Sequence, residues 1–268
     1  QLFPRFHQWN CVTKCLNDVK KNGVGQRYLI EHSAGSGKTE TISWTAHELI
    51  NIRRPDGEKL FSSVIVVTDR VGLDSNIKST IKQLKKTPGL IEMIGGDEDI
   101  RPQGAKNKQL AKALHDRREI IVVTLQTFPF ALDQIARDDT LTGANFAVLI
   151  DEAHSSQTGQ FAGKMKAALK LASKDKSKQT GDPDATVTDE EMILAYFKNQ
   201  QEDRSWPENV SFFAYTATPK SETKTLFGRD SDKIDEKTGR PVPESFDLYP
   251  MRQAIEEGYI LDVLQGYI

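Results

Sequence analysis

The sequence has few cysteines, no excess of charge of either sign and no long apolar run. Two cysteines in 268 residues cannot build a disulfide framework, so we expect reduced thiols and a cytoplasmic protein. The 36 basic and 38 acidic residues give a net charge of −2, so any contact with nucleic acid must use a local basic surface. Neither a signal peptide nor a run of about eighteen apolar residues is present, and we therefore expect no membrane partner.

The two cysteines are four residues apart. On a helix, Cys11 and Cys15 would share one face. They could form half of a metal site, but no histidine or further cysteine close in the sequence completes it. We therefore predict that both are buried thiols of an ordinary core.

Short apolar runs alternate with helical patterns along the chain, which predicts a parallel sheet with helices on both faces. The predicted strands are residues 28–30, 64–67, 120–123, 147–150 and 211–215. The polar stretch at about 173–208 breaks this rhythm and is predicted to be an insertion that carries one helix. Residues 228–244 are predicted to form a loop or hairpin, and residues 249–258 a short helix that ends at Gly258.

The strongest motif is a glycine-rich turn between a predicted strand and a predicted helix, from His32 to Thr39. Glycines let backbone N–H groups turn inward around an anion, and the positive end of the following helix faces the same anion. Lys38 can reach the β- and γ-phosphates of ATP, and the Thr39 hydroxyl can bind Mg²⁺. The usual pattern opens with glycine, whereas this sequence has His32. The residues expected to hold the nucleotide are Gly35, Ser36, Gly37, Lys38 and Thr39.

Two further motifs follow predicted strands. Asp151-Glu152-Ala153-His154 comes directly after an apolar strand, and parallel strands bring their carboxyl ends to the ligand edge of a sheet. We therefore expect Asp151 to meet the Mg²⁺ held by Thr39, and Glu152 to polarise the attacking water. Thr216 begins the third motif, Thr-Ala-Thr-Pro, at the end of another apolar strand.

A phosphate loop, a DEAH tetrad and a Thr-Ala-Thr element in this order resemble the first, RecA-like motor lobe of superfamily 2 helicases and translocases. The resemblance implies that the element beginning at Thr216 links the nucleotide state to the nucleic-acid contacts, and that His154 couples the ATP site to this element. Phe6-His7-Gln8 resembles the Q-motif, which implies that Gln8 reads the adenine edge. Residues that follow other strands resemble the family's DNA-contacting motifs and are expected to grip phosphates; these are Arg70, Thr124 and Gln126.

Four segments narrow the resemblance to the motor and nuclease (R) subunit of type I restriction enzymes: 124–128, 150–157, 213–220 and 249–264. The resemblance implies an ATP-dependent translocase of double-stranded DNA whose partners are methylation and specificity subunits. We expect residues 1–268 to be a fragment, a single motor lobe, with the start of a linker to a second lobe at about 249–268. The nuclease site and the arginine finger would lie elsewhere, so we expect the isolated chain to hydrolyse ATP poorly.

Other interpretations remain open at this point. A general DNA or RNA helicase would share the first three motifs, and a regulatory module could bind nucleotide without hydrolysis, although Glu152 argues against the latter. A GTPase or kinase would share only the phosphate loop. Against a GTPase, Asn107-Lys108 lacks the aspartate that a guanine reader would use.

Overall fold

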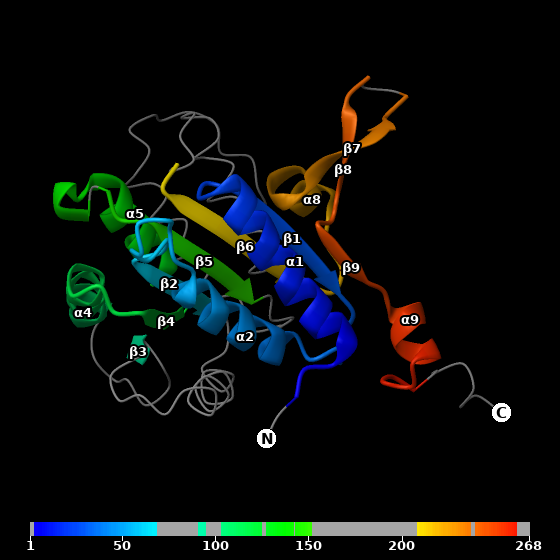
Figure 1. The fold of residues 1–268 in the computed structure, drawn as a ribbon, viewed down its shortest axis with the longest axis horizontal. Helices are drawn as coiled ribbons and strands as arrows, with labels where there is room; N and C mark the ends of the chain where they lie inside the picture. Colours follow the sequence, from blue (N-terminus) through cyan, green and yellow to red (C-terminus); the bar gives the residue numbers. More distant parts are fainter. Residues whose placement is uncertain are drawn as a thin grey trace, which may run out of the picture.

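The computed structural model describes residues 3–68, 91–94, 103–124, 127–141, 143–151, 208–236 and 239–261. Its centre is a sheet of seven strands in the order β3-β4-β2-β5-β6-β1-β9 (Figure 1). Every neighbouring pair in this sheet is parallel. The strands are β1 (Arg27–His32), β2 (Ser63–Thr68), β3 (Ile91–Ile94), β4 (Ile120–Thr124), β5 (Phe146–Asp151), β6 (Val210–Thr216) and β9 (Asp247–Tyr249).

The central strands are continuous apolar runs because helices cover both faces of the sheet. Alternate residues of each strand point to opposite faces. On β1, Tyr28 and Ile30 join one apolar cluster, while Leu29 joins the other. The same alternation holds on β2, where Val64 and Val66 lie in one cluster and Ile65 and Val67 in the other. The sheet therefore separates two cores.

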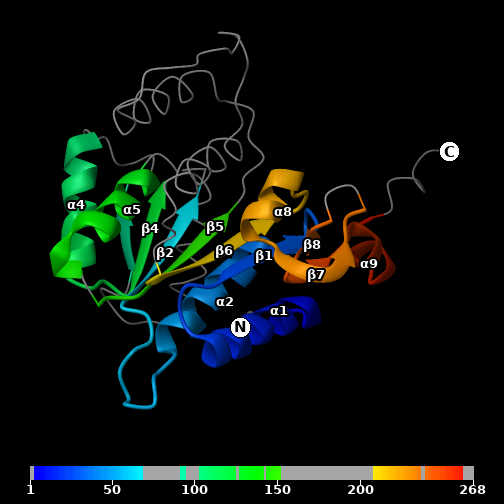
Figure 2. The ribbon, with the colours of Figure 1, turned by 90° about the horizontal axis from the view of Figure 1, so that it is seen from above.

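Figure 2 shows the helices on the two sides of the sheet. Apolar residues of α1 (Phe6–Asn22) and α2 (Lys38–Asn51) pack on one face, in the cluster that contains Tyr28. Those of α4 (Gln103–His115), α5 (Phe128–Arg137) and α8 (Ser221–Phe227) pack on the other face. A short 3-10 helix, η1 (Asp139–Leu141), follows α5. The predicted α/β fold with helices on both faces is confirmed.

A two-stranded antiparallel hairpin, β7 (Arg229–Ile234) and β8 (Pro241–Glu244), projects from the body (Figure 1). Its base is fixed by Arg229, which donates two hydrogen bonds to the carboxylate of Asp18 on α1, at 2.9 and 2.6 Å. The same guanidinium carbon lies 4.8 Å from the ring centroid of Tyr28 and 4.4 Å from that of Phe246. An ion pair and two cation–π contacts thus join the hairpin to the sheet.

All five predicted strands are present, and the hairpin confirms the prediction for residues 228–244. The helix predicted at 249–258 is α9 (Met251–Glu256), and Gly258 follows it with φ +73°. The structure also has α1, β3 and β9, which were not predicted. The insertion at about 173–208 lies outside the described residues except for Glu208. Among the described residues, no helix is long and apolar enough to cross a membrane.

Candidate nucleotide-binding site

The phosphate loop joins the end of β1 to the start of α2. Gly35 and Gly37 have φ values of +76° and +81°, a region that side chains with a Cβ rarely adopt. A Cβ on Gly37 would also lie 2.5 Å from Nε2 of Gln8, closer than atoms can approach. α2 begins at Lys38, so its free N–H groups and positive dipole end face the loop. The strand, glycine-rich turn and helix that the sequence predicted are therefore present, and such a turn can accommodate an anion.

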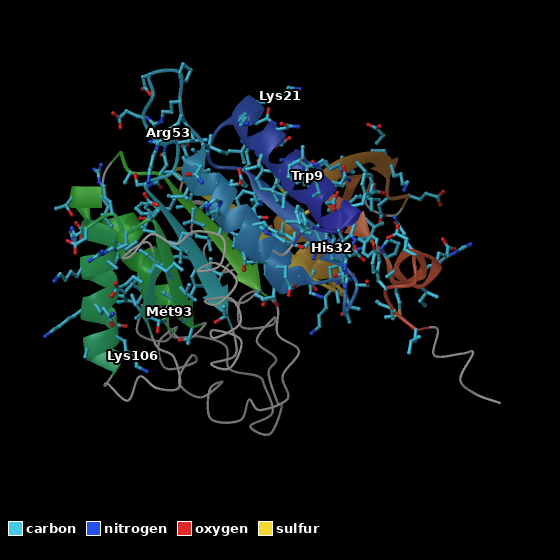
Figure 3. The ribbon with its side chains drawn as sticks, turned by 60° about the horizontal axis from the view of Figure 1, so that its bottom comes forward. Trp9, Lys21, His32, Arg53, Met93 and Lys106 are labelled. Atoms are coloured by element: carbon cyan, nitrogen blue, oxygen red, sulfur yellow. The ribbon has the colours of Figure 1, made fainter. Side chains whose placement is uncertain are left out.

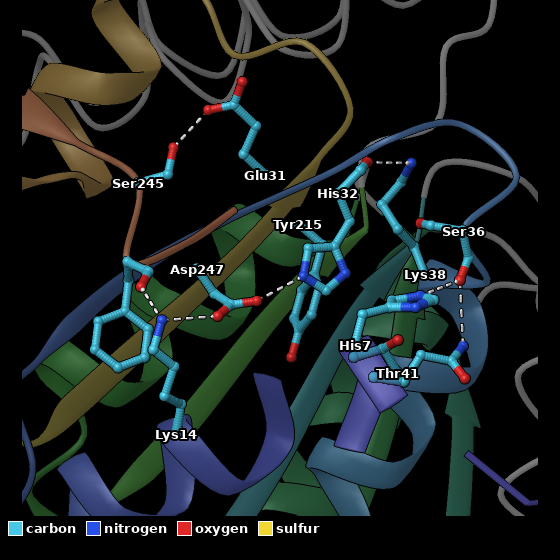
Figure 4. Close-up of polar contacts among 12 residues, drawn as sticks. His7, Lys14, Glu31, His32, Ser36, Lys38, Thr41, Tyr215, Ser245 and Asp247 are labelled. Atoms are coloured by element: carbon cyan, nitrogen blue, oxygen red, sulfur yellow. Dashed lines mark hydrogen bonds and ion pairs between the residues drawn. The ribbon is translucent and has the colours of Figure 1, made fainter. Parts of the chain in front are cut away.

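Lys38 is folded back onto this loop. Its Nζ donates to the carbonyl oxygen of His32 at 3.2 Å and to that of Ser33 at 3.4 Å (Figure 4). The ammonium is therefore held at the loop, half-buried, by neutral carbonyl groups. Phosphate oxygens would form stronger, charge-assisted hydrogen bonds with the same group. Thr39 follows in the first turn of α2 and is also half-buried.

Residues from the start of α1 hold the other side of the loop. Gln8 donates from Nε2 to the carbonyl oxygens of Ser36, at 3.3 Å, and Gly37, at 2.9 Å. Its Oε1 accepts from the backbone N–H of Arg5 at 2.8 Å. His7 also contacts Ser36, with 2.9 Å between Nε2 and the carbonyl oxygen. Through these hydrogen bonds the amide of Gln8, which is only 3% exposed, both caps α1 and holds that helix against the loop.

The histidine that replaces the expected glycine has a structural role. His32 is fully buried at the end of β1, and its Nε2 lies 2.8 Å from Oδ2 of Asp247. The other oxygen of Asp247 accepts from Nζ of Lys14 at 2.9 Å (Figure 4). Burial acts to raise the pKa of Asp247, but the hydrogen bonds from His32 and Lys14 outweigh it and lower that pKa. The side chain of His32 therefore links β1 to β9, and through Asp247 to Lys14 of α1, and does not form part of the turn of the loop.

β9 supports the loop directly. The backbone N–H of Ser33 donates to the carbonyl oxygen of Tyr249 at 2.9 Å, which extends the pairing of β1 with β9 into the loop. The ring of His7 stacks on that of Tyr249, with centroids 3.8 Å apart and 8° between the planes. Burial, the largest influence, lowers the pKa of His7. The residues at 249 and beyond, predicted to start a linker, thus begin with part of the sheet.

The ends of the central strands lie at one edge of the sheet. Asp151 ends β5 and pairs in register with Tyr215, the residue before Thr216 at the end of β6. Thr216 in turn pairs with Glu31 of β1, next to the start of the loop. Asp151 and Thr216 are 7% and 2% exposed. The topology therefore brings both residues to the edge that carries the phosphate loop.

Thr124 ends β4 at the same edge, paired in register with Thr68 of β2. Its Oγ1 lies 3.3 Å from Oγ1 of Thr127, and its side chain is 8% exposed. The remaining predicted site residues lie outside the described residues; they are Arg70, Gln126, Glu152 and His154.

Three residues that contact the loop or its support were not predicted: His7, Asp247 and Tyr249. His7 lies within the Phe6-His7-Gln8 segment, but no pattern gave it a role. Asp247 and Tyr249 follow a charged hairpin and lack the apolar run that identifies a strand. Their pairing with β1 and their contacts with His32 and His7 show that they lie beside the loop.

Two solved structures match this chain in a structural comparison. A nuclease-deletion mutant of the Type ISP restriction-modification enzyme LlaGI, in complex with a DNA substrate mimic, matches with a TM-score of 0.51 and 17% identity. That match covers 96% of this chain and 18% of the other, so this chain spans less than a fifth of that protein. The UvsW helicase from bacteriophage T4 matches with a TM-score of 0.41 and 12% identity, over 85% of this chain and 59% of the helicase.

Comparison with curated protein sequences gave no match. The first structural match supports the α/β fold. At family level, the SWI2/SNF2 ATPase family matches residues 7–183, which is more than half of the chain. This range begins at His7, next to the glutamine that holds the phosphate loop, and includes the loop and Asp151. The chain therefore belongs to the SWI2/SNF2 ATPase family.

Proposed function

We propose that this chain is the first, ATP-binding motor lobe of an ATP-dependent translocase of double-stranded DNA, within the R subunit of a type I restriction enzyme. The observation that carries the proposal is the phosphate loop itself. Its two glycines have positive φ, Lys38 is held at its rim, and Gln8 ties it to α1. Asp151 and Thr216 end neighbouring strands at the same edge of the sheet.

We assign the roles at the phosphates from the sequence motifs, and the positions of Lys38, Asp151 and Thr216 support the assignment. Lys38 exchanges the carbonyl oxygens of the loop for oxygens of the β- and γ-phosphates. The Thr39 hydroxyl and the Asp151 carboxylate would hold Mg²⁺, a hard cation that prefers oxygen ligands. Glu152 polarises the attacking water, and Thr216 and His154 couple the nucleotide state to the DNA contacts. When bound, the Mg²⁺ neutralises charge that develops on the phosphates.

Gln8 reads the adenine in this proposal. Both N–H groups of its amide are engaged with the loop, whereas Oε1 accepts one hydrogen bond from the described residues, that of the Arg5 N–H. A carbonyl oxygen can accept two. The free acceptor position suits the exocyclic amino group of adenine and does not suit the carbonyl oxygen that guanine carries at the same place. Replacing Gln8 with Ala should therefore reduce the preference for ATP over GTP.

Duplex DNA is the proposed track. Arg70, Thr124 and Gln126 contact its phosphates without reading bases, and methylation and specificity subunits select the site. A protein with a similar fold, the Type ISP enzyme, was solved with a DNA substrate mimic, which is the reason for choosing duplex DNA as the test ligand. A general helicase would instead respond most strongly to single strands.

Binding of Mg-ATP by the 268-residue chain is the first test. Titration with a fluorescent ATP analogue should give saturable binding that Lys38→Ala weakens at least tenfold. Lys21→Ala is the matched control, because Lys21 is exposed at the opposite end of α1 from the loop (Figure 3). Equal affinity in the Lys38→Ala variant and the unchanged chain would refute the assignment of the phosphate loop.

Turnover distinguishes the alternatives. We expect steady-state hydrolysis near background in the isolated chain, because the resembled motors complete their site with an arginine of a second lobe. A longer chain that carries this lobe should be stimulated by duplex DNA more than by single strands. Stimulation by single strands alone would favour a general helicase, and binding without hydrolysis in the longer chain would favour a regulatory module.

A further inference from the structure

The face of the sheet covered by α1 contains a buried group of metal-binding side chains outside the nucleotide site proper. Cys11 of α1, His32 at the end of β1 and Asp247 of β9 each offer a ligand atom, and these atoms lie within 4.8 Å of one another. The side chains of Cys11 and His32 are fully buried, and Asp247 is 5% exposed. Cys15, one turn along α1, is also fully buried but is not one of the three residues of this group.

We propose that a zinc ion binds here, with Cys11, His32 and Asp247 as the three ligands that already lie together and Cys15 moving in from one helical turn away to complete a tetrahedron. Thiolate, imidazole and carboxylate are the ligand types that Zn²⁺ takes in proteins. Metal–ligand bonds of about 2.0–2.3 Å place tetrahedral ligand atoms roughly 3.3–3.8 Å apart. Closing the group around an ion therefore requires movements of about 1 Å, within the range of side-chain rotation.

The net charge of the group is compatible with a buried zinc ion. Without a metal, the carboxylate of Asp247 is balanced by the ammonium of Lys14, which contacts Oδ1 and leaves Oδ2 facing His32. With Zn²⁺, two thiolates, one carboxylate and the Lys14 ammonium again sum to zero, so neither state buries a net charge. Binding releases one proton from each thiol.

His32 can adapt to the ion without losing a hydrogen bond elsewhere. Metal binding through Nε2 requires the ring proton to sit on Nδ1. Nδ1 of His32 is buried and has no hydrogen-bond partner within the described part of the chain. The change of tautomer therefore disrupts no existing contact at that atom.

A zinc ion here would join three elements that are far apart in the sequence. His32 and Asp247 are 215 residues apart, and Cys11 belongs to α1, which packs on the face of the sheet that carries Tyr28 and Ile30. Because His32 precedes the phosphate loop, the ion would hold α1, β1 and β9 together beneath the loop. The site is independent of ATP, and Lys38→Ala should bind zinc as well as the unchanged chain does.

The test uses the 268-residue chain without a histidine tag, purified under reducing conditions. Elemental analysis should find about one zinc per chain, and Co²⁺ should give the near-ultraviolet absorption of thiolate–cobalt charge transfer. Cys11→Ser and His32→Gln should each lower the bound zinc at least tenfold. His47→Gln, a change at a half-buried histidine of α2, should leave it unchanged.

The spectrum of the unchanged chain with Co²⁺ keeps the test valid if a variant fails to fold. Less than a tenth of an equivalent of zinc, together with no thiolate–cobalt band, would overturn the proposal. The group would then be an ion pair beside two core thiols.

Discussion

Replacing Asp18 with Asn should loosen the hairpin from the body in a way that depends on pH. The carboxylate accepts two hydrogen bonds from Arg229 and a third from the hydroxyl of Tyr28 at 2.9 Å. The hydrogen bond from Arg229 is the largest cause that lowers the pKa of Asp18, from 3.8 to about 2. A depressed carboxyl pKa contributes stability above its unfolded value, and this contribution is lost as the pH falls through the folded value.

The shift sets the size of the effect. A fall from 3.8 to about 2 corresponds to roughly 2.5 kcal/mol at about 1.4 kcal/mol per unit. The side chains of Asp18 and Arg229 are 17% and 34% exposed, so solvent screens part of this energy. We expect Asp18→Asn to lower the free energy of unfolding by about 1–2 kcal/mol at pH 7.

Urea denaturation of both proteins between pH 7 and pH 3 measures the difference. Asn keeps the size of the side chain and one acceptor for Arg229, so the substitution isolates the charge. The stability difference should be constant down to about pH 5 and about half as large at pH 3. A difference that is the same at pH 7 and pH 3 would refute the assignment of this energy to the carboxylate.

Two further substitutions test the site and its core. Gly37→Ala should weaken Mg-ATP binding at least tenfold in a fluorescence titration, because the added Cβ would collide with Gln8. Gly57→Ala is the control, since Gly57 also has a positive φ of +88° but no atom lies within 4 Å of the added Cβ; it should lower the free energy of unfolding by only about 1 kcal/mol. Equal ATP affinities of the Gly37→Ala variant and the unchanged chain would contradict the collision. Tyr215→Phe removes the hydrogen bond of 2.8 Å from the Tyr215 hydroxyl to Thr45 of α2. This should lower the free energy of unfolding by about 1 kcal/mol, measured by calorimetry, and leave the ATP affinity unchanged in the titration.

The strands that could be predicted are those buried on both faces. In β2, β4 and β5 every residue is buried. Because both faces of these strands must be apolar, each appears in the sequence as a continuous run of apolar residues. β3 has only one fully buried residue, Ile94, and its Glu92 interrupts the pattern. β9 has three residues and no apolar run, because its position depends on pairing with β1.

The site divides in the same way. Residues 32–39 fold locally, so spacing alone identified the phosphate loop and the start of α2. The contact of Gln8 with the loop bridges 29 residues, and only resemblance to the Q-motif pointed to it. The partner of His32 lies 215 residues away, and no local pattern connects the two. Cys11 and Cys15 are indeed buried, but the histidine and aspartate beside Cys11 were found only through the fold.

The late position of β9 in the sequence has a consequence for synthesis. β1 is made early, yet its neighbours β6 and β9 begin at residues 210 and 247. At about 5–20 residues per second, a ribosome needs roughly 10–40 s to travel from β1 to β9. During this time the strand that leads into the phosphate loop has unpaired N–H and C=O groups on an apolar segment, the feature that promotes aggregation. A chain shortened before Asp247 would keep every nucleotide-binding motif and still leave that edge open.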